Sequence, residues 1–497
     1  MNYLVGIDQS TQGTKALLVD MLGKVCQKAY LPHKQLISEC GWVSHDPREI
    51  FENVVAAARA VVTSSGIDSS DVCGVAISNQ RETCLAWNRV TGEPAGGAIV
   101  WQCARGKEIS DAVKAKGMGE DIRKMTGIPL SPYFSAAKMG WTMKHNPKAS
   151  DWAERDELCL GTIDAWLVYK LTRKKCFYTD YSNASRTQLF NLHSLTWDED
   201  ICRLFHIPVK ALPKVLDSNG EFGRTTLEGF LNHEVDICSV MGDSHSALYA
   251  QGCTVPGMTK VTYGTGSSIM MNIGKSFIAS QKGLATSLAW GRNGEVDYVF
   301  EGNINYTGSV VTWMKDLGVL PSAEESSDMA FGANPEDETY LVPAFSGLGA
   351  PYWNDEARAL VCGMSRTTGK SELVKAGLDS IAYQVADVIE LMKTEMQVDE
   401  IKLRVDGGPT GNPYLMQMQA DITGQEVLVS GIEELSAYGV VRMASEKLFG
   451  AFRTRAVRTM YSPRMSETER RRRYGRWKVA VARALSDSAV KGEGESL

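Results

Sequence analysis

No apolar run in the 497-residue sequence approaches the roughly 18 residues that a membrane-spanning helix needs. An excess of basic residues is also missing, because the formal net charge is -6 at pH 7. A broad basic surface would be needed to attract nucleic acid or an anionic membrane. The chain enters a predicted strand at once, MNYLVGID, without the features of a signal peptide. We therefore expect no nucleic acid and no membrane among its main partners.

Disulfide and zinc-binding patterns are absent as well. The eleven cysteines are odd in number, are spread from Cys26 to Cys362 and include no CxxC pair. This usage is typical of reduced, mostly buried thiols, so we expect a cytoplasmic protein. The seven histidines form no HExxH motif, which argues against a zinc site.

Size and composition indicate a globular protein with a large core. Hydrophobic residues make up 43% of the chain and charged residues 23%. These fractions are ordinary for folded domains. The length suffices for two large domains or three small ones.

The most informative stretch is MGDSHSALYAQGCTVPGMTKVTYGTGSSIMMNIG, residues 241–274. Asp243 stands before a small-residue segment with helical character, and a β-hairpin follows with the turn YGTG, which contains Thr265. Glycine lets the backbone approach a bulky anion, and threonine adds a hydroxyl donor. A carboxylate and such a turn would suit a hydroxyl acceptor and a phosphate donor. Taken alone, the turn is more often an ordinary hairpin, and a lone aspartate more often caps a helix.

A second hairpin of this kind opens the chain: YLVGIDQSTQGTKALLVD, residues 3–20. Its first strand ends at Asp8. The turn and the following strand offer flexibility, hydroxyl donors and one cation for a phosphate group: Ser10, Thr11, Gly13, Thr14 and Lys15. The alternative is a solvated hairpin with a surface lysine. Because two similar hairpins stand in the two halves of the sequence, we predict a duplicated architecture that holds a nucleotide between the halves.

Polar and aromatic residues follow two further predicted strands. Strand 75–78 runs towards Arg81 and Glu82, which together can donate to and accept from vicinal hydroxyls. Ligand sites lie at the carboxyl ends of strands in open α/β sheets. The strand within AIVWQC ends at Trp101, which is either core packing or an apolar wall for a polyol. An exposed ion pair of little energetic value is the alternative for Arg81 and Glu82.

Several helices are predicted from their caps and periodicity. Asp46 precedes a proline and an amphipathic pattern, as an N-cap does. Residues 127–145 contain a proline-rich loop with Tyr133 and then a helix with Lys138. Residues 163–171 are also expected to form a helix.

The second half of the chain adds a candidate nucleotide site. Gly308 stands at a predicted helix start, and a long helix is expected over residues 371–396. A strand then runs into a Gly-Gly turn with Gly408, followed by Asn412 and a helix. Such a turn suits a nucleotide, although a single Gly-Gly pair is weak evidence. The arginine-rich tail, SETERRRRYGRWKVAVARAL, is predicted to be a charged amphipathic helix with a solvated face, in preference to a nucleic-acid site.

These motifs together resemble the FGGY carbohydrate kinase family, and within it the glycerol kinase branch. The resemblance covers nearly the whole chain in order: VGIDQSTQGTKALLVD, GWVSHDPREI, SNQRET, AIVWQC, YFSAAKMGW, MGDSHSAL, VTYGTG, VPAFSGLGAPYW, LRVDGG and ETERRRRYGRWK. It implies an α/β fold with two actin-like, ribonuclease-H-like domains and a catalytic cleft between them. We expect the domains over residues 1–249 and 250–497. The family also implies Mg²⁺-dependent phosphoryl transfer from ATP to a sugar or polyol hydroxyl, and homodimers or homotetramers.

The resemblance also assigns roles to single residues. Asp243 is similar to the general base that takes the proton of the accepting hydroxyl, and Asp8 to the carboxylate that positions the metal. The expected substrate-binding residues are Arg81, Glu82, Trp101, Tyr133, Asp243 and Ser244. The expected ATP-binding residues are Thr11, Gly13, Thr14, Lys15, Thr265, Gly308, Thr312, Gly408 and Asn412.

Two departures from the glycerol kinase pattern concern the substrate. This chain has Gly242-Asp243-Ser244 where glycerol kinases usually carry GDQ, and Ser267-Ser268 where a phenylalanine usually follows the YGTG turn. Both changes remove bulk and add hydroxyls, so we expect a four- or five-carbon polyol or ketose. Glycerol is the alternative within the same class. A non-catalytic actin-fold ligand sensor is the alternative of another class.

Overall fold

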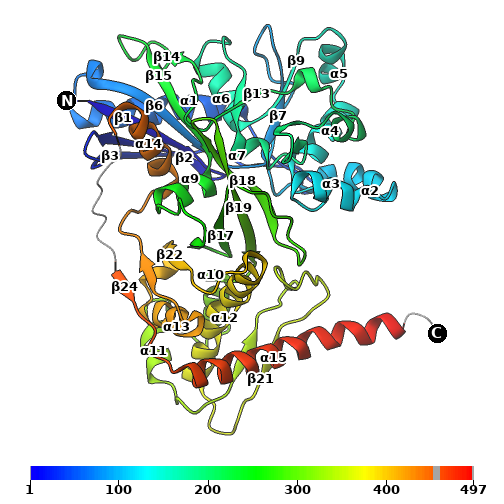
Figure 1. Cartoon of the computed structure of the whole chain (residues 1–497), viewed down its shortest axis with the longest axis vertical. Helices are drawn as coiled ribbons and strands as arrows, with labels where there is room; N and C mark the ends of the chain where they lie inside the picture. Colours follow the sequence, from blue (N-terminus) through cyan, green and yellow to red (C-terminus); the bar gives the residue numbers. More distant parts are fainter. Residues whose placement is uncertain (1, 451–458, 495–497) are drawn as a thin grey trace.

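A computed structural model describes residues 2–450 and 459–494 (Figure 1). Two large mixed sheets dominate it. The first has the strand order β14 (Arg224–Thr225), β15 (Val235–Gly242), β6 (Val72–Asn79), β1 (Tyr3–Gln9), β2 (Gly13–Asp20), β3 (Val25–Pro32). The second has the order β18 (Ala285–Arg292), β19 (Glu295–Ile304), β17 (Ser267–Gly274), β16 (Met258–Tyr263), β22 (Lys402–Asp406), β23 (Val427–Val429), β24 (Thr459–Tyr461).

The two sheets repeat one strand arrangement. In the first, β3, β2 and β1 form an antiparallel meander, and β6 and β15 follow in parallel to β1. In the second, β19, β17 and β16 form the meander, and β22 and β23 follow in parallel to β16. The hairpins β1–β2 and β16–β17 are therefore equivalent, and the duplicated architecture predicted from them is confirmed.

Alternating side chains of β1 fill different cores on the two faces of the first sheet. Val5 and Ile7 pack with α1 (Pro47–Ser65) and α6 (Ile163–Leu171). Leu4 packs on the other face with α9 (Asp243–Ala250) and α14 (Leu435–Leu448). This alternation follows from the two-residue period of a strand. Asp46 caps α1 as predicted, since its side chain accepts from the Arg48 backbone N–H.

Helix α14 covers the first sheet although it comes from the far end of the chain. It packs against α9, β6 and β1. Gly6 in β1 allows this approach, because a Cβ there would lie 2.8 Å from the Ala437 carbonyl oxygen. The same apolar cluster also contains Met258 and Met270 of the second sheet, so α9 and α14 lie between the two sheets.

The second sheet packs against α12 (Lys370–Met396), α13 (Pro413–Thr423) and α15 (Glu467–Gly494), which runs along the edge of the molecule (Figure 1). Three successive arginines of α15 are paired with acids: Arg471 with Glu467, Arg472 with Glu338 and Arg473 with Glu469. These pairs fit the predicted solvated helix face.

The ends of a further, five-stranded sheet adjoin three of the predicted substrate residues, since Arg81 and Glu82 precede its strand β7 and Trp101 follows its strand β8. Its order is β4 (Leu36–Ile37), β5 (Val43–His45), β8 (Ala98–Ile99), β7 (Cys84–Asn88), β9 (Leu158–Thr162). The AIVWQC strand is shorter than predicted and ends at Ile99, because the Trp101 N–H bonds the Thr83 hydroxyl rather than a neighbouring strand.

The remaining elements connect these layers. Short strand pairs are β10 (Tyr178–Asp180) with β13 (Lys214–Leu216), β11 (Phe190–Asn191) with β12 (Thr196–Trp197), and β20 (Tyr340–Val342) with β21 (Leu360–Cys362). The other helices are α2 (Lys107–Ala115), α3 (Gly119–Thr126), α4 (Ser135–His145), α5 (Pro147–Glu154), α7 (Tyr181–Ala184), α8 (Glu199–Leu204), α10 (Gly308–Asp316) and α11 (Ser326–Gly332). Among the described residues, no helix combines the length and the apolar character needed to cross a membrane.

Candidate active site

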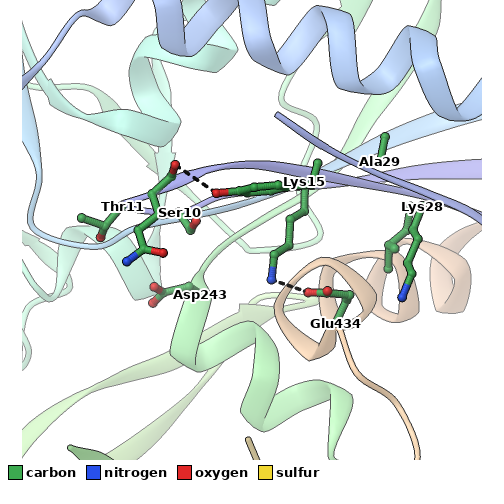
Figure 2. Close-up of a pocket in the computed structure, with 10 residues that line it drawn as sticks. Ser10, Thr11, Lys15, Lys28, Ala29, Asp243 and Glu434 are labelled. Carbon is green, nitrogen blue, oxygen red and sulfur yellow. Dashed lines mark hydrogen bonds and ion pairs between the residues drawn. The ribbon is translucent and has the colours of Figure 1, made fainter. Parts of the chain in front are cut away.

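A pocket of about 690 Å³ lies where the first hairpin meets the start of α9 (Figure 2). It brings together three predicted residues, Thr11, Lys15 and Asp243, with Ser10 and with Glu434, which precedes α14. Figure 2 shows Asp243 below the hairpin turn and Lys15 reaching towards Glu434, 2.7 Å away. The pocket thus combines hydroxyls, the ammonium groups of Lys15 and Lys28 and the two carboxylates of Asp243 and Glu434.

Asp243 is the first residue of α9, directly after the carboxyl end of β15. Its Oδ1 accepts from the Ser244 backbone N–H at 2.6 Å and lies 3.2 Å from Arg81 Nε. About a third of its side chain is exposed, at 34%. The carboxylate is therefore oriented through one oxygen and remains open to the pocket.

A buried network of four charges lies beneath Asp243. Arg81 donates to both oxygens of Glu301, at 2.8 and 3.0 Å. Arg186 donates to Glu82 at 2.6 Å and lies 3.1 Å from Glu301. Burial alone would raise the pKa of Glu301, but the charges of Arg186 and Arg81 outweigh it and hold that pKa well below its usual range. Such a network fixes Arg81 and Glu82, because removing one partner of a buried ion pair costs about 3–5 kcal/mol.

This network differs in two ways from what the sequence suggested for Arg81 and Glu82. Arg81 and Glu82 are not an exposed ion pair, since both are buried and each has its own partner. The partners Glu301 and Arg186 were missed from the sequence. Their signal is weak: Arg186 ends the polar loop YTDYSNASR, and Glu301 is the acid in the buried part of strand β19.

Trp101 and Tyr133 form an aromatic pair, with ring centroids 5.5 Å apart. The Trp101 indole N–H donates to Thr11 Oγ1 at 2.9 Å, which ties this pair to the first hairpin. Burial raises the pKa of Tyr133, so its hydroxyl stays protonated. The two predicted walls of a substrate site therefore lie next to the predicted phosphate hairpin.

Asp8 has the surroundings of a cation ligand. It is buried at the end of β1 and accepts from Ser78 Oγ at 3.2 Å. Burial, with the negative charge of Asp243 second, raises the pKa of Asp8 to about 7. Two carboxylates that repel each other beside a phosphate hairpin are the oxygen donors that a hard divalent cation prefers. The donor set fits magnesium.

A second pocket, of about 440 Å³, gathers four predicted ATP-binding residues: Gly308, Thr312, Gly408 and Asn412. Asn412 caps α13 by accepting from the Leu415 N–H, and its amide donates to Ser326 Oγ at 2.9 Å. Gly408 has no neighbour within 4 Å of a would-be Cβ, so a ligand can approach its backbone. At the preceding Gly407, φ is 97° and a Cβ would collide with the Tyr263 carbonyl oxygen.

The predicted residues of the two hairpin turns differ in how far they are exposed to the pockets. Thr265 is exposed, and its carbonyl oxygen accepts from the Thr307 and Ser309 N–H groups next to Gly308. Gly13 and Thr14 do not line the first pocket. The Thr14 hydroxyl is buried and has no hydrogen-bond partner among the described residues. Ser244, at the start of α9, is half-buried.

Two sheets of one topology, each with a hairpin turn beside a pocket, define an actin-like, ribonuclease-H-like phosphotransferase with two domains. Comparison with known proteins agrees. Residues 3–250 match the N-terminal domain and residues 259–446 the C-terminal domain of the FGGY family of carbohydrate kinases. The chain belongs to this family, and it is an ATP-dependent kinase with an alcohol group as acceptor. Its co-substrate is a small carbohydrate or polyol.

Named relatives cover nearly the full chain. Glycerol kinase 1 of Thermotoga maritima is 42% identical over 493 residues, which span 98% of this chain and all of that protein. Glycerol kinase of Alkaliphilus metalliredigens is 41% identical over 97% of this chain and 98% of its own. The crystal structure of Plasmodium falciparum glycerol kinase with ADP superposes with a TM-score of 0.92 at 32% identity, over 98% of both chains. A xylulose kinase from Lactobacillus acidophilus, at 19% identity, has the same fold.

Proposed function

We propose that the enzyme phosphorylates glycerol with ATP. This proposal is supported by full-length relatives named glycerol kinases at about 40% identity. It is also supported by Arg81, which contacts Asp243, and by the aromatic pair of Trp101 and Tyr133 at the first hairpin. Family membership favours turnover over the alternative of a non-catalytic sensor, because the relatives are kinases.

The observation that carries the proposed chemistry is the half-open Asp243 carboxylate in the pocket of the first hairpin. Its Oδ1 is held by Ser244 and Arg81, so the other oxygen is free to accept the proton of a bound hydroxyl. A base within hydrogen-bond reach typically contributes roughly 10²- to 10⁴-fold to a rate. We therefore assign Asp243 as the general base.

The remaining residues hold and position the reactants. Thr11 and Lys15 hold phosphate oxygens at the first hairpin, Thr265 at the second, and Gly308, Thr312, Gly408 and Asn412 hold the nucleotide. Asp8 would hold Mg²⁺, which would supply positive charge against the phosphate groups of ATP. Gly13 and Thr14 shape the hairpin backbone. Because phosphoryl transfer needs little covalent chemistry from the protein, positioning accounts for most of the catalysis.

A four- or five-carbon polyol or ketose is the second candidate acceptor. Ser244 and Ser268 are small and polar at positions where glycerol kinases usually carry larger residues. The Ser268 hydroxyl is buried and has no hydrogen-bond partner among the described residues. A buried hydroxyl without a partner costs free energy, which a further substrate hydroxyl would recover.

ADP release with Mg²⁺-ATP against an acceptor panel tests the proposal. The panel contains glycerol, erythritol, threitol, the pentitols, erythrulose, ribulose and xylulose. We expect glycerol to give the highest kcat/KM. A four- or five-carbon acceptor with a higher kcat/KM would establish the second candidate, and turnover of none would refute both.

Three further expectations remain predictions. They are the division of the chain into residues 1–249 and 250–497, a homodimer or homotetramer, and a cytoplasmic location. The location rests on the eleven cysteines, none of which forms a disulfide bond in the structure. Size-exclusion chromatography with light scattering tests the oligomeric state.

A further inference from the structure

Lys138 is a fully buried lysine whose partners are all backbone carbonyl groups. It lies on α4, and its Nζ donates to the carbonyl oxygens of Pro132 at 3.0 Å, of Phe134 at 3.1 Å, of Trp101 at 3.4 Å and of Tyr133. No carboxylate of the described residues forms an ion pair with it. A buried ammonium group is costly unless hydrogen bonds compensate for lost water. Its three N–H groups therefore all donate to two backbone segments, residue 101 and residues 132–134.

The two segments are those that carry Trp101 and Tyr133. Their rings contact each other, but the backbone that supports them comes from separate parts of the chain. The ammonium group joins the Trp101 carbonyl to those of residues 132–134. Because Trp101 also donates to Thr11, the same connection fixes the aromatic pair relative to the first hairpin. Near its start, α4 also holds Glu82, whose carbonyl oxygen accepts from Ser135 Oγ at 3.0 Å.

We propose that Lys138 is a positioning residue for the acceptor pocket, one that holds Trp101 and Tyr133 at a fixed separation around the bound alcohol. The proposal rests on the proposed function, since it takes these two residues as walls of the acceptor site. Lys138 touches neither reactant. A wall displaced by about 1 Å misplaces the attacking hydroxyl, and misplacement of this size can cost on the order of 10²-fold in rate.

The test uses Lys138→Met, which keeps the length of the side chain and removes every donor. Lys144→Met is the matched control, because Lys144 lies on the same helix, is exposed and pairs with Glu108 at the surface. Assays at pH 7 keep Lys138 charged, since burial lowers the pKa of Lys138 to about 8. We expect the KM for the acceptor to rise at least tenfold in Lys138→Met. The KM for ATP should stay within twofold, because α4 lines neither pocket and Lys15 of the first hairpin is held by Glu434 rather than by the aromatic pair.

A second readout separates positioning from general damage. A misplaced acceptor lets water compete, so the ratio of ATP hydrolysed to acceptor phosphorylated should increase several-fold in Lys138→Met and not in Lys144→Met. Lys138→Arg restores N–H donors and should recover part of the acceptor KM. If Lys138→Met does not fold, Lys138→Arg is the test variant. We then expect its KM for the acceptor to rise at least threefold and its KM for ATP to stay unchanged.

The proposal is overturned if folded Lys138→Met keeps the acceptor KM within twofold of wild type, or if Lys138→Arg does so where Lys138→Met does not fold. It is also overturned if the KM values for acceptor and ATP rise by the same factor, which would indicate general damage. Failure of the proposed function is seen separately, because the wild-type enzyme would then phosphorylate no acceptor of the panel.

Discussion

The two oxygens of Asp243 have different surroundings. Oδ1 is occupied by Arg81 and the Ser244 N–H, whereas no described residue bonds Oδ2. Asp243→Asn keeps the shape and removes the base, so we expect kcat to fall by about 10²- to 10⁴-fold. Affinities for ATP and acceptor, measured by calorimetry, should change only a few-fold.

The control for this substitution is Asp236→Asn, an exposed carboxylate at the other end of β15 that pairs with Arg224 at 3.4 Å. Its kcat should equal that of wild type. If Asp243→Asn keeps more than a tenth of the wild-type kcat, another group is the base.

Asp164 on α6 links burial to a pH-dependent stability. Its Oδ2 accepts from Thr179 at 2.5 Å, and burial, with Asp180 second, raises the pKa of Asp164 to about 7. The folded state therefore binds a proton that the unfolded state, with a pKa near 3.9, releases. The contribution of Asp164 to the free energy of unfolding is therefore fully present below about pH 4. It is lost as the pH rises to about 7.

Asp164→Asn should remove this dependence. Between pH 5 and pH 8 the variant should gain on the order of 2 kcal/mol of stability relative to wild type, measured from thermal midpoints. Asp8, with a pKa in the same range, leaves part of the dependence in both proteins. Asp121→Asn, at an exposed position, is the control. Equal pH dependence in wild type and Asp164→Asn would contradict this reading.

Sequence reasoning found the residues of the site where chemistry is concentrated in a short motif. Asp243, Thr11 and Lys15 share one pocket, and Gly308, Gly408 and Asn412 share another. Glu301 and Arg186 were not predicted, because no motif in the adjacent sequence indicates their role. Their role depends on a network that folding assembles from three distant segments.

At the scale of elements, helix ends were predictable because capping is local. The predicted N-cap Asp46 makes its expected backbone bond. The end of the strand at AIVWQC could not be predicted, since the length of a strand is set by its partners elsewhere in the sheet. Its first two residues find β5 and β7, and Trp101 bonds a side chain instead.

Trp477 anchors helix α15 in the apolar core that packs against the second sheet. The Trp477 indole N–H donates to Asp387 Oδ2 at 2.8 Å, and its ring stacks on Tyr383 with centroids 5.2 Å apart. Tyr474 donates to the other oxygen of Asp387 at 2.6 Å. Trp477→Ala should therefore destabilise the protein by about 3–5 kcal/mol.

Thermal unfolding tests this prediction, with Arg471→Ala as the exposed control on the same helix. At temperatures below its transition, Trp477→Ala should keep wild-type kcat, because α15 lines neither pocket. A melting temperature unchanged by the substitution would show that α15 adds nothing to the fold.

At the scale of the whole molecule, the duplication could be predicted because each hairpin marks the start of one repeat. The position of α14 could not. Its residues follow β23 in the second half of the chain, yet they cover the first sheet. This placement depends on Gly6, where close packing with Ala437 leaves no room for a side chain.

The position of α14 gives a test of the division at residues 249 and 250. A fragment of residues 1–249 would lack this helix and would leave Leu4, Leu17 and Met241 uncovered on one face of the first sheet. Large exposed apolar patches lead to aggregation. We therefore expect this fragment to bind a hydrophobic dye and to elute as aggregates. The same fragment joined by a flexible linker to residues 433–449 should elute as a monomer and bind less dye, because Val441 and Tyr438 again cover the face. A fragment 1–249 that is monomeric and unfolds cooperatively without α14 would show that the helix is dispensable to the first domain.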